Sequence, residues 1–337
     1  MGRAIEQPRG SVQTIPNRFG IGEATNADWK ELNHFRNIQR SEHWPNDPPE
    51  HLERTKLSVK STLSCVRLTD GIIASGTLGD RLDIYVLPER RRQGFGRQLL
   101  GLLAEEAKAQ NRQHLKARTD ANIPDGEAFA RLMGGEIKST WVTSDLELTH
   151  VNHNLIRTWV KSAQNRAPNF KLGFWDGPCP EDKLERTTTM FQVMNEAHGE
   201  NPDHVLTAAQ VRERDAKRVT GGIGRWTMYI ENGVSGEFAG FTAISLDPHE
   251  QEIIHQGDTG VPIKFRGRGL GRWLKAAMME KVVNDLPTTR LIRTGNEATN
   301  EPMIRINRDM GFEPVKTFNH WKFDLDSIEV YLSNKGL

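Results

Sequence analysis

The chain has 337 residues, and its 45 basic and 44 acidic side chains leave a formal net charge of +1 at pH 7. A chain so close to neutral has no overall field that would draw it to nucleic acid or to an anionic membrane, so neither is expected as a partner. The length fits two domains of ordinary size, and a hydrophobic content of 36% is enough for two buried cores.

Only two cysteines are present, Cys65 and Cys179, and neither lies in a CxxC or Cys/His spacing. We therefore expect free thiols and no bound metal. No apolar run approaches the roughly 20 residues of a membrane span, and the first residues lack the apolar core of a signal peptide. The sequence thus favours a cytoplasmic protein without a membrane partner.

The first half of the chain predicts strands and helices in mixed order. A strand at residues 19–23 and helical stretches precede a pair of strands within residues 60–78. A third strand leads into the segment ERRRQGFGRQLL, which starts at Glu89. Apolar residues then recur three and four apart, which predicts a helix that begins within the glycine pair. A strand at residues 114–120, a short helix and a last strand complete this half.

The second half predicts the same order of elements. A helix at residues 151–168 links the halves, and a strand at residues 170–174 and helices follow it. Residues 225–246 predict a hairpin with an Asn-Gly turn. The segment KFRGRGLGRWLK starts at Lys264, and a strand at residues 289–296, a short helix and a last strand come after its helix.

The two halves are copies of one unit. A shift of 175 residues places Arg91 on Arg266. The same shift matches Asp83 with Asp258, Val86 with Val261, Gly94 with Gly269, Gly96 with Gly271, and Arg118-Thr119 with Arg293-Thr294. We therefore predict an α/β protein with domains at residues 1–150 and 169–337 and a connecting helix at residues 151–168. Each domain is expected to be a mixed, mostly antiparallel sheet flanked by helices.

Each glycine pair lies where a strand turns into a helix. Residues without a Cβ let backbone N–H groups turn inward, and the helix N-terminus adds unpaired donors with partial positive charge, so the turn suits a phosphate. One such turn can be purely structural, but two matching copies favour binding. A Walker A motif is excluded because GK[ST] is missing, and the spacing differs from the dinucleotide fingerprint. The turn therefore predicts a ligand with a pyrophosphate.

The pattern [QR]-x-x-G-x-[GA] after a strand ending in V-x-P resembles the acetyl-CoA loop of the GCN5-related N-acetyltransferases, the GNAT family. It occurs as VLPERRRQGFG and as VPIKFRGRGLG. The later segment RTGNEATNEPMIRINRDMGFEPV is similar to the family's strand, loop and helix with a closing Gly-Phe. The resemblance covers most of the chain. It implies a bacterial tandem GNAT protein, similar in architecture to mycothiol synthase, with acetyl-CoA or another short acyl-CoA as co-substrate.

The resemblance also implies where the cofactor binds. The strand before each loop is expected to splay from its neighbour and to bond the pantetheine through its backbone, while the loop holds the pyrophosphate. The implied residues of the first copy are Ile84, Tyr85, Val86, Arg91, Arg92, Gln93, Gly94, Phe95, Gly96 and Arg97. Those of the second copy are Thr259, Gly260, Val261, Arg266, Gly267, Arg268, Gly269, Leu270, Gly271 and Arg272, with Asn296 and Asn300 at the thioester end.

The catalytic groups are less clearly marked. The family often has a tyrosine four residues before the glycine of Gly-Phe, where it protonates the thiolate, but Ala130 and Asn307 stand at these positions. His255 and Asp258, in the strand before the second loop, are candidates for the base. A surface role for His255 and a structural role for Asp258, which the first copy repeats, are the alternatives. The candidate catalytic residues are thus His255, Asp258 and Asn307.

These observations predict an enzyme that moves an acetyl group from acetyl-CoA to a primary amine of a small molecule. The second copy is expected to be catalytic, because the first has Gly134-Gly135 in place of Gly-Phe. A peptide or protein amine as acceptor, or a CoA-binding module without turnover, is the alternative. Acidic residues and histidines within residues 42–47 and 196–203 favour a cationic acceptor. We expect a monomer or a homodimer.

Overall fold

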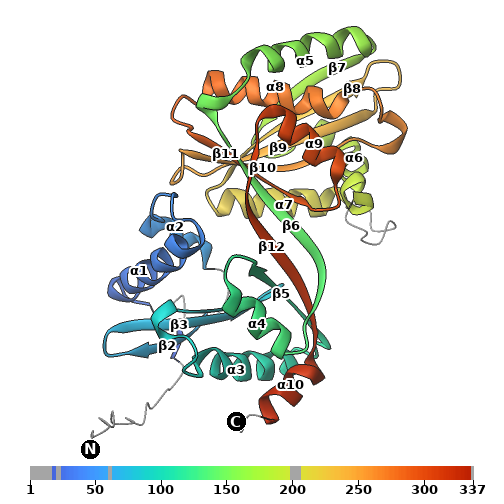
Figure 1. Ribbon diagram of the computed structural model, residues 1–337. Helices are drawn as coiled ribbons and strands as arrows, with labels where there is room; N and C mark the ends of the chain where they lie inside the picture. The colour runs from blue at the N-terminus through green and yellow to red at the C-terminus, as the bar shows by residue number, and fades with distance from the viewer. Residues whose placement is uncertain (1–16, 20–23, 60–62, 198–205, 335–337) are drawn as a thin grey trace, which may run out of the picture. The chain divides into compact units, whose positions relative to one another are not determined.

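The structure is a computed structural model, and it describes residues 17–19, 24–59, 63–197 and 206–334. Its elements are shown in Figure 1. The strands are β1 Asn17–Phe19, β2 Leu63–Leu68, β3 Gly71–Leu78, β4 Leu82–Val86, β5 His114–Asp120, β6 Glu136–Glu147, β7 Phe170–Asp176, β8 Gly224–Asn232, β9 Phe238–Leu246, β10 Ile253–Gly260, β11 Leu291–Glu297 and β12 Glu313–Asp324. The helices are α1 Asn26–His43, α2 Leu52–Ser58, α3 Phe95–Ala109, α4 Pro124–Leu132, α5 His153–Arg166, α6 Leu184–Ala197, α7 Ala208–Thr220, α8 Leu270–Asp285, α9 Glu301–Met310 and α10 Leu325–Ser333.

The described strands form two sheets. One has the order β1-β2-β3-β4, and the other has the order β5-β12-β6-β11-β10-β9-β8-β7. β10 pairs with β11 in parallel, whereas the pairs within the first sheet, the pair β6–β11 and the successive pairs from β7 to β10 are antiparallel. The order of elements is the one predicted for both halves, except that α10 follows the last strand of the second half and was not predicted. Residues 20–23, the rest of the expected first strand, lie outside the described residues.

The chain folds into two compact units, and each takes residues from both halves. One unit comprises residues 1–118, 128–136 and 321–337, and the other comprises residues 119–127 and 137–320. Each unit therefore completes itself with the last strand of the other copy. The boundaries predicted at residues 150 and 168 describe the duplication along the chain, and they stay a prediction.

The first unit is built on β2, β3 and β4. A capping box starts α1, because the Thr25 hydroxyl accepts a hydrogen bond from the Asp28 backbone at 3.3 Å and the Asp28 carboxylate accepts one from the Thr25 backbone at 2.9 Å. The apolar side of α1 then packs with α3 and the strands. The side chains of this core include Trp29, Leu32, Phe35, Val66, Ile73 and Leu99.

A second core of this unit depends on the last part of the chain. Trp321 and Phe323 of β12 and Ile328 of α10 pack against Leu100 and Leu103 of α3. These five side chains are at most 2% exposed. Burial of this much apolar surface is worth several kcal/mol, at about 25 cal/mol per Å². The first unit is therefore not complete without residues from β12 and α10.

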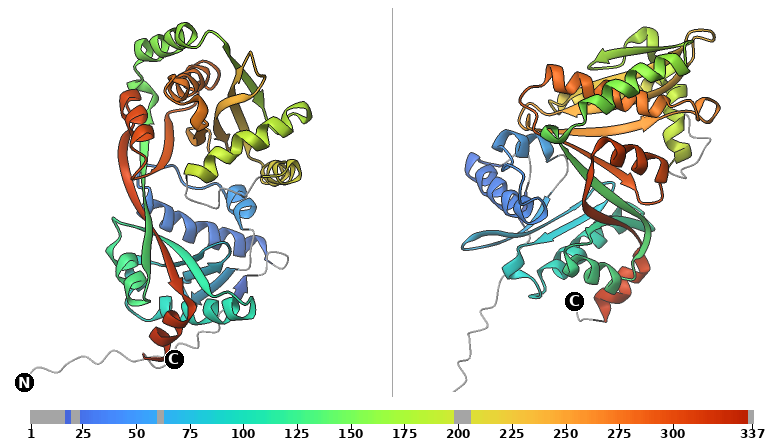
Figure 2. Two further views of the ribbon diagram at one scale, coloured as in Figure 1. Left: turned by 90° about the vertical axis from the view of Figure 1, so that its right-hand side faces the viewer. Right: turned by 45° about the horizontal axis from the view of Figure 1, so that its top comes forward.

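In the second unit the sheet is covered on both faces. Helices α8 and α5 lie on one face, and α6 and α7 lie on the other, as Figure 2 shows. The face under α8 buries Trp226, Met228, Ile244 and Ile254. Neighbouring residues along a strand point to opposite faces, so Tyr229 and Phe241 pack with α6 instead. This division decides which side chains can meet at the functional site.

One charged side chain lies inside the core of the second unit. Lys275 of α8 is 2% exposed, and its ammonium lies 5.1 Å from the centre of the Phe312 ring. No hydrogen bond or ion pair joins it to another described residue. Burial lowers its pKa from 10.5 to about 7. The shift of 175 residues places Lys275 on Leu100, which is fully buried in the first unit.

Replacing Lys275 with methionine is expected to raise the melting temperature by several degrees. Between pH 7 and pH 10 the unfolded chain binds a proton at this amine that the folded chain does not, so wild-type stability rises with pH in this window. The penalty near pH 7 is on the order of 4 kcal/mol. The advantage of Lys275→Met in thermal melts should therefore be largest at pH 7 and shrink towards pH 10. Lys161→Met, an exposed lysine of α5, is the control, and a pH-independent difference would contradict the argument.

Candidate functional site

β10 and β11 separate halfway along their length. They run parallel and pair from Ile253 opposite Leu291 to Gln256 opposite Thr294. β10 then continues to Gly260 and stays paired with β9, but it has no further pairing with β11 in the described chain. In the first copy, β4 and β5 belong to different sheets. The splayed strand implied by the family resemblance is thus present in both copies.

β10 also carries a bulge next to this opening. Its register against β9 shifts between Gln256 and Thr259, so Gly257 and Asp258 lie opposite Ala243 alone. A bulge leaves one residue out of the ladder and re-aims its backbone groups. β4 pairs with β3 without any such shift. The second copy therefore has a bulge at the opening, and the first does not.

The second glycine loop is a sequence of tight turns. A 3₁₀ turn at Ile263–Phe265 comes first, and Gly267 and Gly269 follow with φ angles of 77° and 79°. The Arg266 Nε donates a hydrogen bond to the Val261 carbonyl oxygen at 2.9 Å, which closes the loop onto the end of β10. α8 starts directly after it. Backbone N–H groups in such alternating turns form an anion-binding concavity.

The first loop has the same backbone. A 3₁₀ turn at Pro88–Arg90 is followed by positive φ angles of 61° at Arg92 and 94° at Gly94. The Arg91 Nε donates to the Val86 carbonyl oxygen at 3.2 Å. Each feature falls on its counterpart under the shift of 175 residues. The repeat found in the sequence is thus repeated in the geometry of both loops.

The second glycine of each pair lies against the strand before the loop. A Cβ on Gly96 would be 3.7 Å from a Val86 methyl carbon. A Cβ on Gly271 would be 3.7 Å from the Ile306 Cδ1 and 3.9 Å from a Val261 methyl carbon. These are ordinary contacts, so the protein itself tolerates a small side chain here. A larger side chain would take the space beside the open strand edge.

Three of the predicted cofactor-binding residues turn their side chains into the protein. Phe95 and Leu270 are 6% and 1% exposed and belong to the two cores, and Tyr85 is also buried. Only their backbone groups can face a ligand. Gln93 and Arg268, which match each other in the repeat, are exposed.

The first arginine of each loop differs in its partners. The Arg91 guanidinium lies 2.6 Å from the Glu42 carboxylate, which also accepts a hydrogen bond from the Tyr85 hydroxyl at 2.8 Å. Burial and the Glu42 carboxylate raise the pKa of Tyr85, so it stays a neutral donor. Arg266 has no carboxylate partner among the described residues. The positive charge is neutralised in the first loop and free in the second.

The last arginine shows the opposite arrangement. The Arg97 guanidinium lies against Gly94, and its buried Nε has no hydrogen-bond partner in the described structure. Arg272 lies 3.5 Å from the Asp309 carboxylate and 5.3 Å from the centre of the Trp159 ring. These two arginines occupy matching positions in the repeat, but their surroundings are different.

The predicted asparagines belong to β11 and to α9 with its N-cap. Asn307 is 3% exposed, and its amide nitrogen donates to the Asn296 side-chain oxygen at 2.6 Å. The Asn307 oxygen is buried without a donor in the described structure, which is costly unless a ligand supplies one. The Asn300 side chain caps α9 by accepting a hydrogen bond from the Met303 backbone at 3.3 Å. Their contacts with a cofactor stay a prediction.

A buried polar chain beside the bulge was not predicted. The Gln256 amide donates to the Thr242 hydroxyl at 3.0 Å, and this hydroxyl lies 2.7 Å from that of Thr259. Gln256 and Thr242 are 8% and 0% exposed. Satisfied polar groups in a core fix the geometry around them. The threonine within the largely apolar strand β9 was the signal in the sequence.

The two candidate bases lie on β10. His255 is half-exposed and its Nε2 is 3.6 Å from the Glu250 carboxylate. Asp258 is exposed and belongs to the bulge itself. His255 lies three residues before the bulge, opposite Ser245. Asp258 is therefore the nearer of the two to the open strand edge, and both roles stay predictions.

The acidic loops do not offer free carboxylates in the part of the chain that the structure describes. Glu42 is bound by Arg91, and Asp47 lies 3.4 Å from Arg40. The side chains of residues 196–203 lie outside the described residues. The described structure thus lends no support to a cationic acceptor.

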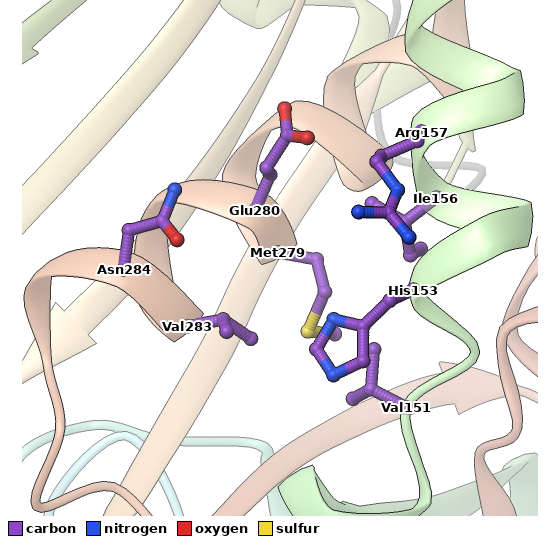
Figure 3. Close-up of a pocket in the computed structure, with 8 residues that line it drawn as sticks. All are labelled: Val151, His153, Ile156, Arg157, Met279, Glu280, Val283 and Asn284. Atoms are coloured by element: carbon purple, nitrogen blue, oxygen red, sulfur yellow. The ribbon is translucent and has the colours of Figure 1, made fainter.

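A separate pocket lies between α5 and α8 (Figure 3). It is lined by Val151, His153, Ile156, Arg157, Met279, Glu280, Val283 and Asn284. The lining residues of α8 belong to its second half, whereas the glycine loop is at its start, and the other lining residues lie on or just before α5. None of the predicted site residues lines it. Among the described residues there is also no cluster of His, Cys, Asp and Glu that fits a metal, and no helix with the length and apolarity to cross a bilayer.

The comparisons with known proteins agree with the loop geometry. Residues 29–134 match the model of the Acetyltransferase (GNAT) family. This segment is a GNAT acetyltransferase domain. The match runs from α1 to the end of α4, so it falls on the first copy. A search of curated protein sequences gives no match.

Solved structures extend the likeness to both copies. A tandem GNAT protein from the clavulanic acid biosynthesis pathway, solved without acetyl-CoA, is 21% identical with a TM-score of 0.73, and the alignment covers 91% of this chain and 97% of that one. A GCN5-related N-acetyltransferase from Sphaerobacter thermophilus is 14% identical with a TM-score of 0.64, over 90% and 94% of the two chains. The predicted fold, two tandem GNAT domains with mixed, mostly antiparallel sheets, is confirmed.

The matched left-handed positions of the two loops give a stability test. Gly267→Ala is expected to destabilise the protein by about 1 kcal/mol, because the added Cβ meets no atom but φ is 77°. Arg92→Gly, at the equivalent position, is expected to stabilise it because strain is relieved. Chemical unfolding of each variant measures both effects.

Gly101→Ala is the control for this pair. It also places a Cβ in open space, but within α3, where alanine is expected to stabilise by about 0.5 to 1 kcal/mol. If Gly267→Ala behaved like Gly101→Ala, the left-handed turn would not be a constraint of the loop.

Proposed function

We propose that the protein is an acyl-CoA-dependent N-acyltransferase that moves an acetyl group from acetyl-CoA to a primary amine of a small molecule, with the second copy as the catalytic one. The bulge in β10 at an open strand edge, beside a loop whose first arginine is free, is the observation that carries this proposal. The GNAT domain match and the tandem GNAT fold support it.

In the proposed reaction the amine nitrogen attacks the thioester carbonyl carbon directly. A C–N bond forms, the C–S bond breaks, and the amine loses a proton while the thiolate leaves and takes one up. Backbone N–H groups at the bulge would face the developing oxyanion, as electrostatic catalysis requires. Asp258 and His255 are the proposed bases, and Asn307 is proposed to contact the thiol end of the cofactor. Holding both substrates in place supplies much of the rate.

The phosphate end of the cofactor is proposed to bind the second loop. Arg266 closes this loop with its Nε and keeps its terminal nitrogens for a ligand. Arg268 is exposed and adds a second charge. The pantetheine would then lie along the open edge of β10 at Thr259 and Gly260, as a strand adds to a free edge.

The first copy is proposed to hold CoA weakly or to serve as a structural copy. Its loop has the same backbone, but Glu42 neutralises Arg91 and β4 lacks the bulge. The family match on this copy supports its descent from a working domain. A peptide or protein amine as acceptor, and CoA binding without turnover, are kept as alternatives, and the protein is proposed to act in the cytoplasm as a monomer or a homodimer.

Matched valine substitutions in the two loops test which copy works. Gly271→Val should reduce kcat/KM for CoA release with an amine panel by at least 100-fold, because the side chain fills the space beside Val261 that the cofactor needs. Gly96→Val, its counterpart, should leave turnover nearly unchanged. Loss of turnover in Gly96→Val alone would reverse the assignment, and no CoA release from the wild type with any amine would reject the enzyme.

Glu42→Gln should strengthen CoA binding at the first copy. The change removes the Glu42 charge from beside Arg91, and one exposed charge contact is worth about 1 kcal/mol, or roughly a fivefold change in Kd. Calorimetric titration of CoA into the Gly271→Val protein, in which the second site is blocked, measures binding at the first site alone. Asp70→Asn, which releases the exposed Arg90 from a 2.6 Å ion pair, is the control and should have no effect. Equal affinities in Glu42→Gln and its parent would contradict a neutralised loop.

A further inference from the structure

Arg225 is a cation on the face of the second unit that α6 and α7 cover. It stands on β8 opposite Ser245 of β9, which pairs in turn with His255 of β10. Tyr229, four residues further along β8, packs on the α6 side, and residues two apart in a strand share a face. The Arg225 side chain therefore lies on this face, away from α8.

The guanidinium points along the strand towards the level of the bulge. Its Nε donates a hydrogen bond to the Thr227 hydroxyl at 3.2 Å. Thr227 pairs with Ala243, the residue that lies opposite the bulge of β10. The Nε of Arg225 thus lies on β8 at the height of the proposed reaction centre. With strands about 4.8 Å apart, the bulge of β10 lies two strands away, at about 10 Å.

The charge of Arg225 has no partner within the described structure. No carboxylate there lies within ion-pair distance, and the terminal nitrogens make no hydrogen bond. Asp215 is the nearest acid on α7, but it is held by Arg218 at 2.5 Å and by the Cys179 backbone at 2.8 Å. A largely buried cation is costly unless something pairs with it.

The charges around this guanidinium do not remove its own charge. Burial, together with the charges of Arg218 and Arg214, lowers the pKa of Arg225 from 12.5 to about 10, and Asp258 and Asp215 oppose the change. The group is still a cation at neutral pH. Its neighbourhood holds three arginines and two carboxylates, and one of the two is already paired. An anion is therefore the ligand that this face favours.

The acceptor is proposed to reach the thioester from this same face, although α6 and α7 cover part of the sheet there. The opposite face of the sheet is filled by α8 and the core beneath it, and the glycine loop leads into α8 (Figure 2). An amine that approaches the bulge from the α6 and α7 side passes over β8 and β9. Arg225 lies on that path.

We propose that Arg225 binds a carboxylate of the acceptor, so that the substrate is an amino acid or a similar amine that carries an acid group. This inference rests on the proposed function and narrows its substrate. The end of the guanidinium presents two parallel N–H groups, which match the two oxygens of a carboxylate. The spacing to the bulge favours an amine several bonds away from the acid.

Pairs of acids and amides test the proposal in the intact protein. The panel is 4-aminobutyrate, 5-aminopentanoate and 6-aminohexanoate, each with its carboxamide, together with leucine and leucinamide. For at least one ω-amino acid, kcat/KM for CoA release should exceed that of the amide by tenfold or more, mainly through KM. Arg225→Gln should reduce this ratio to about one. Arg212→Gln, an exposed arginine of α7 paired with Glu181, is the control and should keep it.

The outcomes separate the two claims. If the amides were turned over as fast as the acids across the whole panel, the role of Arg225 would be overturned, but the proposed acyltransferase activity would not. No turnover with any member, or with any other amine, would reject the proposed function itself. Since Arg225→Gln can lose its fold, its melting temperature is measured first. In addition, calorimetric binding of 6-acetamidohexanoate and of its amide to the wild type gives the same comparison without a variant, and equal affinities would overturn the proposal.

Discussion

The open edge of β10 is the constraint on which the candidate site depends. If β10 paired with β11 along its whole length, every backbone group on that edge of β10 would be used in the sheet. Neither a pantetheine chain nor an oxyanion would then find a free donor there. The pairing with β11 ends at Gln256, and the buried Gln256 and Thr242 side chains hold the bulge just beyond this point. The loop, α8 and the asparagines of α9 are arranged around the gap that results.

The two copies show that backbone and charge can change independently after a duplication. Both loops keep their 3₁₀ turn, their left-handed positions and the arginine bond to a valine carbonyl. The differences lie in side chains outside the loops. Glu42 on α1 neutralises one arginine, and Asp309 on α9 pairs with another. A family pattern in the loop alone therefore does not show which of the two copies keeps an arginine without a carboxylate partner.

The sequence was enough for the order of elements, the repeat and the fold, because periodicity, the Asn-Gly turn and the glycine pairs are local signals. The unpaired charge of Arg225, the burial of Lys275 and the ion pair of Glu42 could not be predicted from the sequence. Each depends on which residues far apart in the chain become neighbours in the fold. Lys275 had one visible sign, since its counterpart in the repeat is Leu100. The exchange of last strands between the copies could not be predicted from the sequence, because β6 and β12 have the same residue pattern whichever copy they complete.

The exchange of last strands also bears on how the protein is made. During synthesis the residues of β1 to α4 emerge long before Trp321, Phe323 and Ile328, which close the apolar side of α3. Until then Leu100 and Leu103 have no cover from β12 and α10, whereas β6 is already available when β11 appears. The half that is translated first is thus the half that finishes folding last. A ribosome that stalled in the second half would leave exposed apolar surface on the first half, and such surface promotes aggregation.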